Sequence, residues 1–170
     1  MRTDAAGAAH RAQPPFRWDG QHHRDRHIGP GQQLDAPEHQ GTAGAAQGGR
    51  FGGWCVYAKD GRVNFVYNVL GIQEFVAEAD VPIPVGTHQV RMEFAYDGGG
   101  LAKGGDVTLY YDGTKVGAGR VGATQPMIFS ADETTDIGYE SGTTVTPDYT
   151  AHGSRFTGKI NWGAARCRQR

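Results

Sequence analysis

Several features that would narrow the function of this chain are scarce or missing. Its 17 Lys and Arg nearly balance 18 Asp and Glu, for a formal net charge of −1, so no excess of positive charge favours nucleic acid or an anionic membrane surface. No apolar run reaches the length of a membrane span, and the N-terminus has no apolar signal-peptide core. We therefore expect no nucleic-acid partner and no membrane partner, and the chain as given predicts a cytoplasmic protein.

Cysteine is also rare. Cys55 and Cys167 are the only two, which is too few for the disulfide framework of a small secreted domain. They could pair if strands bring them together, but two unrelated thiols are the simpler interpretation.

The first 49 residues lack the side chains that build a core. They contain one Ile, one Leu, no Val and no Lys, although five Arg and five of the seven His fall there. Such a segment cannot bury enough apolar surface to offset the entropy of ordering it, so we predict disorder or irregular coil over 1–46, with Phe16 and Trp18 docking locally at most. The same composition is typical of a GC-rich coding region translated out of frame, which the nucleotide sequence would test.

A histidine cluster falls in this segment. His23 and His27 lie four residues apart, beside His22, and on a helix that spacing would place two imidazoles on one face as metal ligands. Glycine and proline residues bracket the cluster, however, and no apolar stripe accompanies it. We therefore predict no helix and no metal site there.

Four segments beyond residue 50 alternate apolar and polar side chains with a period of two, which is typical of half-buried antiparallel strands. They are 62–70, 88–96, 106–111 and 155–162. The residues expected on their buried faces are Val63, Phe65, Tyr67, Val69, Val90, Met92, Phe94, Tyr96, Val107, Leu109, Tyr111, Phe156, Ile160 and Trp162.

Turn residues separate these segments. Asp60-Gly61 and Asp112-Gly113 fit tight hairpins, because Asp-Gly supplies the positive φ angles that such turns need. A longer glycine-rich connection spans 96–105, and Pro82 and Pro84 predict a loop between two strands.

These patterns together predict an all-β chain. No window shows a helical stripe, and short strands at close spacing favour an antiparallel, two-sheet, jelly-roll-like β-sandwich over 47–162. We expect the last strand to pair with an early one, and residues 163–170 to form a polar tail.

Four sequence segments in this part are more specific than the alternating patterns common to β-strands. They are GGRFGGW (48–54), VRMEFAYDGGGLAKGGDVTLYYDG (90–113), TQPMIFSADETTDIGYESGTTVTPDY (124–149) and FTGKINW (156–162). Together they resemble the C-terminal domain of bacterial arylsulfatases, over about 47–162. In that family the domain follows a large α/β catalytic domain and is similar to a concanavalin/laminin-G-type sandwich. The resemblance implies an accessory domain that packs on a sulfatase catalytic domain.

The catalytic chemistry of that family is missing from this sequence. The family's catalytic domain carries a C/S-x-P-x-R motif, whose first residue becomes formylglycine, and side chains that hold a divalent metal. Here Cys55 begins CVYAK, Cys167 begins CRQR, and no Ser begins the pattern. We therefore expect no catalytic residue and no cofactor in this chain, while the resemblance implies sulfuric ester hydrolysis for the parent enzyme.

Carboxylates are the remaining candidates for chemistry. Glu93 and Asp97 lie four apart on one predicted strand and resemble the paired acids of sandwich glycosidases, although a solvated strand face is the simpler interpretation. Asp132, Asp136 and Glu140 are candidate Ca²⁺ ligands at a sheet rim, since carboxylate oxygens suit that ion. Their spacing does not match an EF-hand, and an acidic turn or a docking loop is the alternative.

Aromatic side chains suggest a second function, which is a lectin-like carbohydrate-binding module. Trp54, Tyr57, Tyr67, Tyr110 and Tyr139 could stack on sugars, although such residues more often fill a core or an interface. Tyr110 is the best surface candidate, because both of its neighbours are expected to face inward. A reading frame without selected function is a third, weaker hypothesis.

Overall fold

The computed structural model describes residues 17–19, 42–126 and 135–163 and shows an all-β fold. The strands are β1 (Arg17–Asp19), β2 (Thr42–Gly49), β3 (Gly52–Lys59), β4 (Arg62–Val69), β5 (Gln73–Glu78), β6 (Thr87–His88), β7 (Val90–Tyr96), β8 (Gly105–Tyr111), β9 (Thr114–Val121), β10 (Thr135–Ile137) and β11 (Lys159–Trp162). Within these ranges the structure has no helix, and hence none that could cross a membrane.

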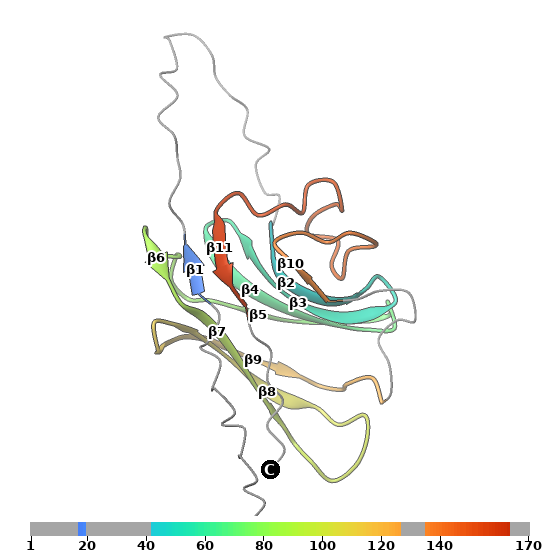
Figure 1. The fold of residues 1–170 in the computed structure, drawn as a ribbon. Helices are drawn as coiled ribbons and strands as arrows, with labels where there is room; N and C mark the ends of the chain where they lie inside the picture. The colour runs from blue at the N-terminus through green and yellow to red at the C-terminus, as the bar shows by residue number, and fades with distance from the viewer. Residues whose placement is uncertain (1–16, 20–41, 127–134, 164–170) are drawn as a thin grey trace, which may run out of the picture.

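Two antiparallel sheets face each other. The larger sheet has the order β10-β2-β3-β4-β5, and the smaller has the order β7-β8-β9. A short third sheet, β11-β1-β6, lies at one end of the pair (Figure 1). The predicted all-β sandwich is confirmed.

The strand and turn predictions are largely confirmed. The segments 62–70 and 106–111 correspond to β4 and β8, and 88–96 corresponds to β6 and β7. Both Asp-Gly pairs form hairpin turns with positive φ, at 51° and 72° after β3 and at 47° and 84° after β8. Only the end of 155–162 is a strand, β11, and it pairs with the early strand β1 as expected.

The first strand of the larger sheet starts earlier than the sequence predicts. β2 begins at Thr42, so the predicted boundary at residue 47 falls inside it. Ala43 and Ala46 are fully buried there, because small side chains fit between the sheet and the chain above it. A strand built from Ala and Gly shows no aliphatic alternation. The residues His22, His23, His27, Phe16, Asp132 and Cys167 lie outside the described residues.

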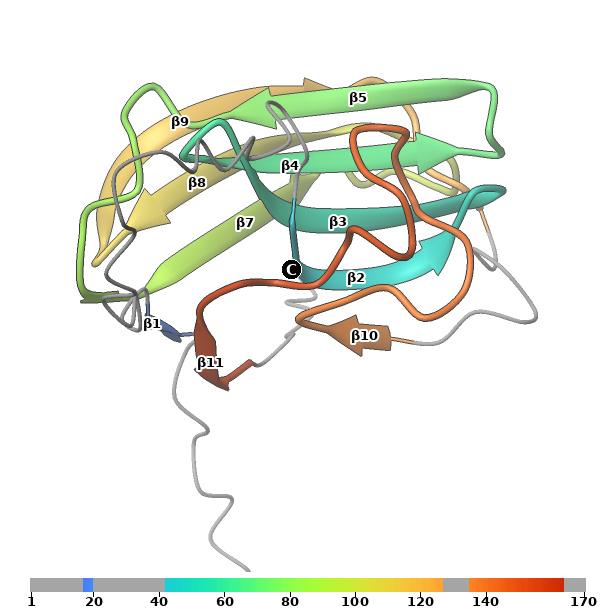
Figure 2. The same cartoon turned by 90° about the horizontal axis from the view of Figure 1, so that it is seen from above.

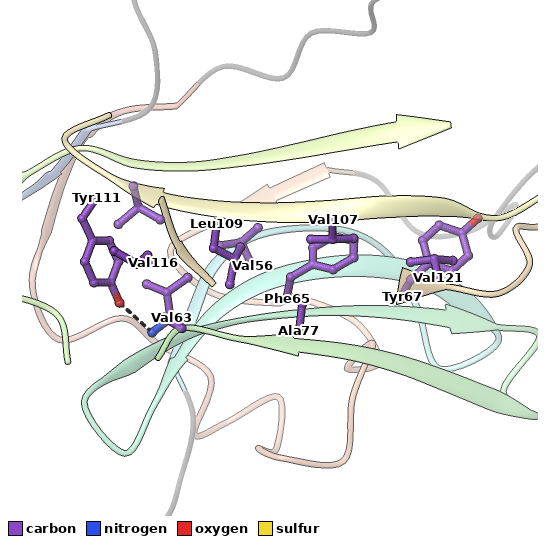
Figure 3. Packing of buried hydrophobic residues seen from close by; sticks show 12 residues of the cluster. Val56, Val63, Phe65, Tyr67, Ala77, Val107, Leu109, Tyr111, Val116 and Val121 are labelled. Atoms are coloured by element: carbon purple, nitrogen blue, oxygen red, sulfur yellow. Dashed lines mark hydrogen bonds between the residues drawn. The ribbon is translucent and has the colours of Figure 1, made fainter. Parts of the chain in front are cut away.

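The main core fills the space between the two sheets (Figure 3). It contains Val56, Val63, Phe65, Tyr67, Ala77, Ala79, Val90, Val107, Leu109, Tyr111, Val116 and Val121. Phe65 of β4 is 2% exposed and lies between Ala77 and Val107. The alternation predicted for β4 and β8 is therefore confirmed on this face.

The two sheets approach most closely where β5 meets β9. Ala79 forms an isolated bridge with Gly117, and the Asp80 amide donates to the Val116 carbonyl at 2.6 Å. A Cβ on Gly119 would lie 2.5 Å from the Cβ of Ala77, so only glycine fits at that contact.

The outer face of the larger sheet is covered as well. Residues 138–158 cross over β2 and β3 (Figure 2), and a second buried cluster lies beneath them. It contains Ala43, Ala46, Cys55, Tyr57, Val66, Val145 and Tyr149. Six consecutive residues of β4 are therefore buried, including Asn64 and Asn68 on the face that the alternation assigns to solvent.

Candidate functional site

The crossing segment, residues 138–158, is anchored to the sheet by a buried polar network. Glu140 is 3% exposed, and its carboxylate accepts hydrogen bonds from the Tyr149 hydroxyl and from the Val145 amide at 2.9 Å. The Tyr149 hydroxyl also lies 2.8 Å from Sγ of Cys55 in β3. Burial raises the pKa of the free Cys55 thiol well above its ordinary value, which disfavours the thiolate form that acts as a nucleophile.

Further hydrogen bonds hold the crossing segment against the sheet. The Ser154 hydroxyl accepts from the Glu140 amide at 3.0 Å and donates to the Ala151 carbonyl at 2.8 Å. The Ala43 amide of β2 donates to the Ser154 carbonyl at 2.7 Å. Asn68 of β4 donates from Nδ2 to the Val145 carbonyl at 2.8 Å. The segment is therefore a fixed layer on the sheet.

A hollow of about 470 Å³ opens on this layer, and we call it the Tyr139 hollow. Its lining residues are Tyr139, Glu140, Ser141, Gly142, Ala151, His152 and Arg155. The Tyr139 side chain is 43% exposed, and Cζ of Arg155 lies 5.5 Å from the centre of its ring. An exposed ring beside a cation can bind a ligand that has both a flat face and a negative charge.

A second hollow, of about 320 Å³, lies on the same face of the larger sheet. Its lining residues are Tyr57, Lys59, Asp60, Asn64, Val76, Glu78 and Asp148. Nζ of Lys59 lies 2.6 Å from Oδ1 of Asp148, and Oδ2 of Asp148 accepts a hydrogen bond from the Tyr57 hydroxyl. Burial alone would raise the pKa of Asp148, but its bonds to Lys59 and Tyr57 outweigh burial and lower it. Lys59 and Asp148 are thus already paired with each other.

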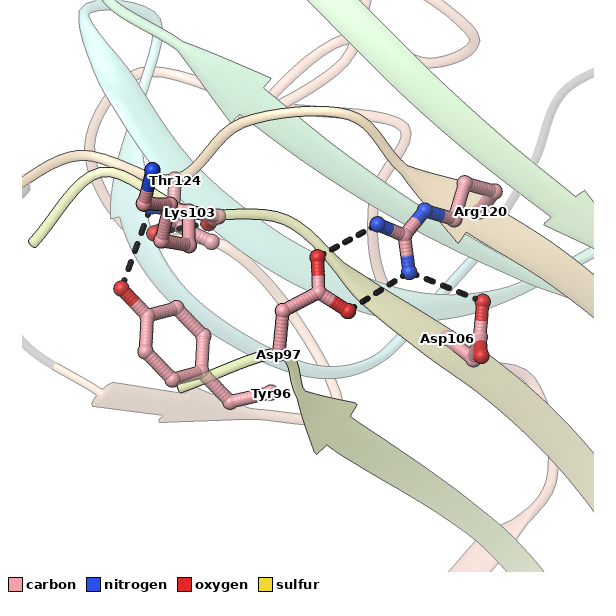
Figure 4. A network of polar contacts seen from close by, with 6 residues as sticks. All are labelled: Tyr96, Asp97, Lys103, Asp106, Arg120 and Thr124. Atoms are coloured by element: carbon pink, nitrogen blue, oxygen red, sulfur yellow. Dashed lines mark hydrogen bonds and ion pairs between the residues drawn. The ribbon is translucent and has the colours of Figure 1, made fainter. Parts of the chain in front are cut away.

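The two carboxylates considered for glycosidase chemistry lie on the outer face of the smaller sheet, and each is bonded to an arginine. Glu93 accepts from Arg91 and from the Tyr110 hydroxyl, the latter at 3.0 Å. Asp97 accepts two hydrogen bonds from Arg120, one at 2.8 Å (Figure 4). The bond to Arg120 lowers the pKa of Asp97, whereas a glycosidase acid needs a raised pKa.

The calcium candidates are only partly within the described residues. Oδ2 of Asp136 accepts from the amide and the hydroxyl of Ser141, at 2.7 and 2.9 Å, and Glu140 points into the buried network. Among the residues that the structure describes, no three His, Cys, Asp or Glu side chains form a group that could hold a metal. Because Asp132 lies outside the described residues, calcium at this rim stays a prediction.

The five aromatic candidates divide by exposure. Tyr57 and Tyr67 are buried, and Trp54 packs against the main core. Tyr110 is covered by Arg91, whose Cζ lies 4.0 Å from its ring centre. Tyr139 is the exposed member of the set. Its neighbours His152 and Arg155 belong to no sequence motif, and only their place in the fold brings them to the ring.

Large apolar side chains gather on two adjacent turns at one end of the sandwich. Phe51 is 69% exposed after β2, and Leu70 and Ile72 are 54% and 83% exposed after β4. The turns touch, since a Cβ on Gly71 would lie 2.8 Å from the carbonyl oxygen of Arg50. We call Phe51, Leu70 and Ile72 the apolar end. Exposed apolar groups of this kind mark protein–protein contacts.

Leu70 has an unfavourable backbone conformation for its side chain. Its φ is 56°, in a tight turn closed by a 2.9 Å hydrogen bond from the Ile72 amide to the Val69 carbonyl. The equivalent position is Asp in the turns between β3 and β4 and between β8 and β9, and Asn or Asp is strongly preferred there.

Replacing Leu70 by asparagine is therefore expected to raise the free energy of unfolding. The expected gain is about 0.5–1 kcal/mol, because Asn adopts the left-handed conformation with less strain. Urea denaturation would measure it, with Ile72→Asn as the matched control that lacks the positive φ. A variant less stable than the wild type would contradict this explanation of the turn.

Comparison with known proteins gives no relative. A scan against protein-family models, a search of curated proteins and a search of solved structures each found no match to this chain.

Proposed function

We propose that this chain is a non-catalytic accessory domain of an arylsulfatase-like protein, and that it packs on a sulfatase catalytic domain through the apolar end. The observation that carries the proposal is the exposure of Phe51, Leu70 and Ile72 on two touching turns. Turn tips normally carry polar residues, so three large apolar groups favour a covered surface. The resemblance of 47–162 to the C-terminal domain of arylsulfatases supports this choice of partner.

The chemistry of the described residues supports a role without catalysis. Cys55 is buried with a raised pKa and lies outside any C/S-x-P-x-R pattern. Glu93 and Asp97 are each bonded to an arginine. A rigid sandwich can still cover or orient a neighbouring active site. The parent activity, hydrolysis of sulfate esters, then belongs to the catalytic domain.

Co-expression with the catalytic domain of an arylsulfatase tests this proposal. The two chains are expected to elute together in size-exclusion chromatography, and Phe51→Ser with Ile72→Ser should separate them. Leu101→Ser is the matched control, because Leu101 is 72% exposed in a different loop. Separate elution of the wild-type chains, or hydrolysis of an aryl sulfate by this chain alone, would overturn the proposal.

A lectin-like carbohydrate-binding module is the second candidate function. It is favoured by one observation, the exposed ring of Tyr139 at a hollow of about 470 Å³. Sites for small ligands typically measure about 300–1,000 Å³. A protein can have this function together with the docking role, since the Tyr139 hollow and the apolar end involve different residues.

A further inference from the structure

Arg155 at the Tyr139 hollow forms no ion pair with any residue that the structure describes. Lys59, Arg62, Arg91 and Arg120 each lie within 4 Å of a carboxylate. Cζ of Arg155 lies 5.5 Å from the ring centre of Tyr139, and within the described ranges neither Arg155 nor His152 forms an ion pair or a side-chain hydrogen bond. A guanidinium has five N–H donors that fit planar oxyanions. Those of Arg155 therefore remain available to a ligand.

The carboxylates closest to the hollow are already bonded. Glu140 belongs to its lining, but its two oxygens accept from Tyr149 and from the Val145 amide. Asp136 accepts from Ser141. These bonds direct both carboxylates to partners within the segment, and neither forms an ion pair with Arg155 in the described part of the chain. The hollow therefore presents a guanidinium beside an aromatic ring.

The backbone holds the ring and the cation beside each other. The Phe156 amide donates to the Gly138 carbonyl at 2.7 Å, and the Glu140 amide donates to the Ser154 hydroxyl at 3.0 Å. Tyr139 and Arg155 lie between these two bonds, on two loop segments that run side by side. Ser154 is fully buried, so this arrangement rests on the packed layer beneath. A site held in place before binding loses less entropy when a ligand arrives.

A second arginine–tyrosine pair, on the smaller sheet, has its charge matched by a carboxylate. Arg91 lies over Tyr110 at 4.0 Å on the smaller sheet, but Glu93 bonds to both side chains. The charge of that arginine is already matched. The pair of Arg155 and Tyr139 has the same two residue types, and no described carboxylate bonds to either side chain, which makes Arg91 a matched control.

We infer that the Tyr139 hollow binds an acidic saccharide. A sugar ring stacks on Tyr139, and the carboxylate or sulfate group of the saccharide accepts hydrogen bonds from Arg155. His152 contributes a further N–H donor at the rim. This inference rests on the carbohydrate-binding alternative and is independent of the docking role of the apolar end.

Calorimetric titration of the full chain tests the inference with saccharides of equal length. Trigalacturonate provides the carboxylate, a sulfated trisaccharide provides the sulfate ester, and maltotriose is the neutral control. We expect either acidic saccharide, or both, to bind at least about tenfold more tightly than maltotriose, as charged hydrogen bonds are strong. Binding of one acidic saccharide alone identifies the group that Arg155 recognises.

Two variants place the binding at the hollow. Arg155→Gln and Tyr139→Ala should each weaken binding of the acidic saccharide by about tenfold or more, while Arg91→Gln leaves it unchanged. Both side chains are exposed, so circular dichroism should show unchanged melting. If binding survives Arg155→Gln, the site lies elsewhere and the inference is wrong.

The other outcomes separate this inference from the function it rests on. Equal binding of maltotriose would preserve the carbohydrate-binding function and overturn recognition of charge. If inorganic sulfate binds as tightly as the acidic saccharides, the hollow is a simple anion site, and the inference that it recognises a saccharide is wrong. No binding of any saccharide would overturn both, and the docking proposal would stand unaffected.

Discussion

Replacing Phe65 by alanine is expected to lower the free energy of unfolding by about 4 kcal/mol, which is the range measured for buried aromatic residues in other cores. Phe65 is 2% exposed and packs between the two sheets, with Ala77 beside it and Val107 opposite (Figure 3). The substitution removes a ring from the packed layer between β4 and β8. Because small domains are stable by about 5–15 kcal/mol, this loss brings the chain close to unfolding at room temperature.

Urea denaturation followed by circular dichroism measures this effect. Ile72→Ala is the matched control, because Ile72 is 83% exposed and its loss should change stability by less than about 0.5 kcal/mol. A loss below about 1 kcal/mol for Phe65→Ala would mean that this ring is not at the centre of the packed layer.

Replacing Glu140 by alanine is expected to cost about 3 kcal/mol, because each buried donor left without an acceptor costs about 1–3 kcal/mol. The substitution leaves the Val145 amide without the acceptor that Glu140 provides, and it leaves the Tyr149 hydroxyl with the sulfur of Cys55, a weak acceptor, at 2.8 Å. Glu93→Ala is the control, since it breaks an exposed ion pair and should cost less than about 1 kcal/mol. Equal losses for the two variants would show that Glu140 does not anchor the crossing segment.

The pH dependence of stability provides a second test of Glu140. Burial raises its pKa above the ordinary value of 4.5, so the folded chain holds this proton more tightly than the unfolded chain does. Glu140 therefore contributes fully at low pH, and its contribution is lost as the pH rises from 4.5 through the raised pKa. In Glu140→Gln this dependence disappears. We expect the wild type to lose stability relative to the variant across that window, and parallel curves would contradict this explanation.

The sequence predicts the inner face of the sandwich well and its outer face poorly. Alternation is a local signal, so Phe65 and Leu109 could be placed in the core from their own strands. Asn68 could not be placed in the same way, because it is buried by a hydrogen bond to the Val145 carbonyl, 77 residues further along the chain. The sequence of residues 138–158 has no periodic pattern, so their packing over the larger sheet follows only from the tertiary fold.

The candidate sites show the same division. Tyr139 was identifiable as an aromatic candidate, but Arg155 reaches it through a backbone pairing that no spacing reveals. Tyr110 was preferred because its neighbours face inward, and that argument could not anticipate Arg91 lying over its ring. The unusual turn at Leu70 could have been recognised from the sequence, because Leu-Gly occupies a tight turn where Asn-Gly or Asp-Gly is usual.

The binding of Leu70→Asn to an arylsulfatase catalytic domain is the most direct test of the docking role. This substitution relieves the strained turn and removes one of the three side chains of the apolar end. Calorimetry should show a variant that is more stable than the wild type and binds the catalytic domain at least about tenfold more weakly, the effect of losing a buried apolar contact. Undiminished binding by this stabilised variant would contradict the claim that the apolar end is the docking surface.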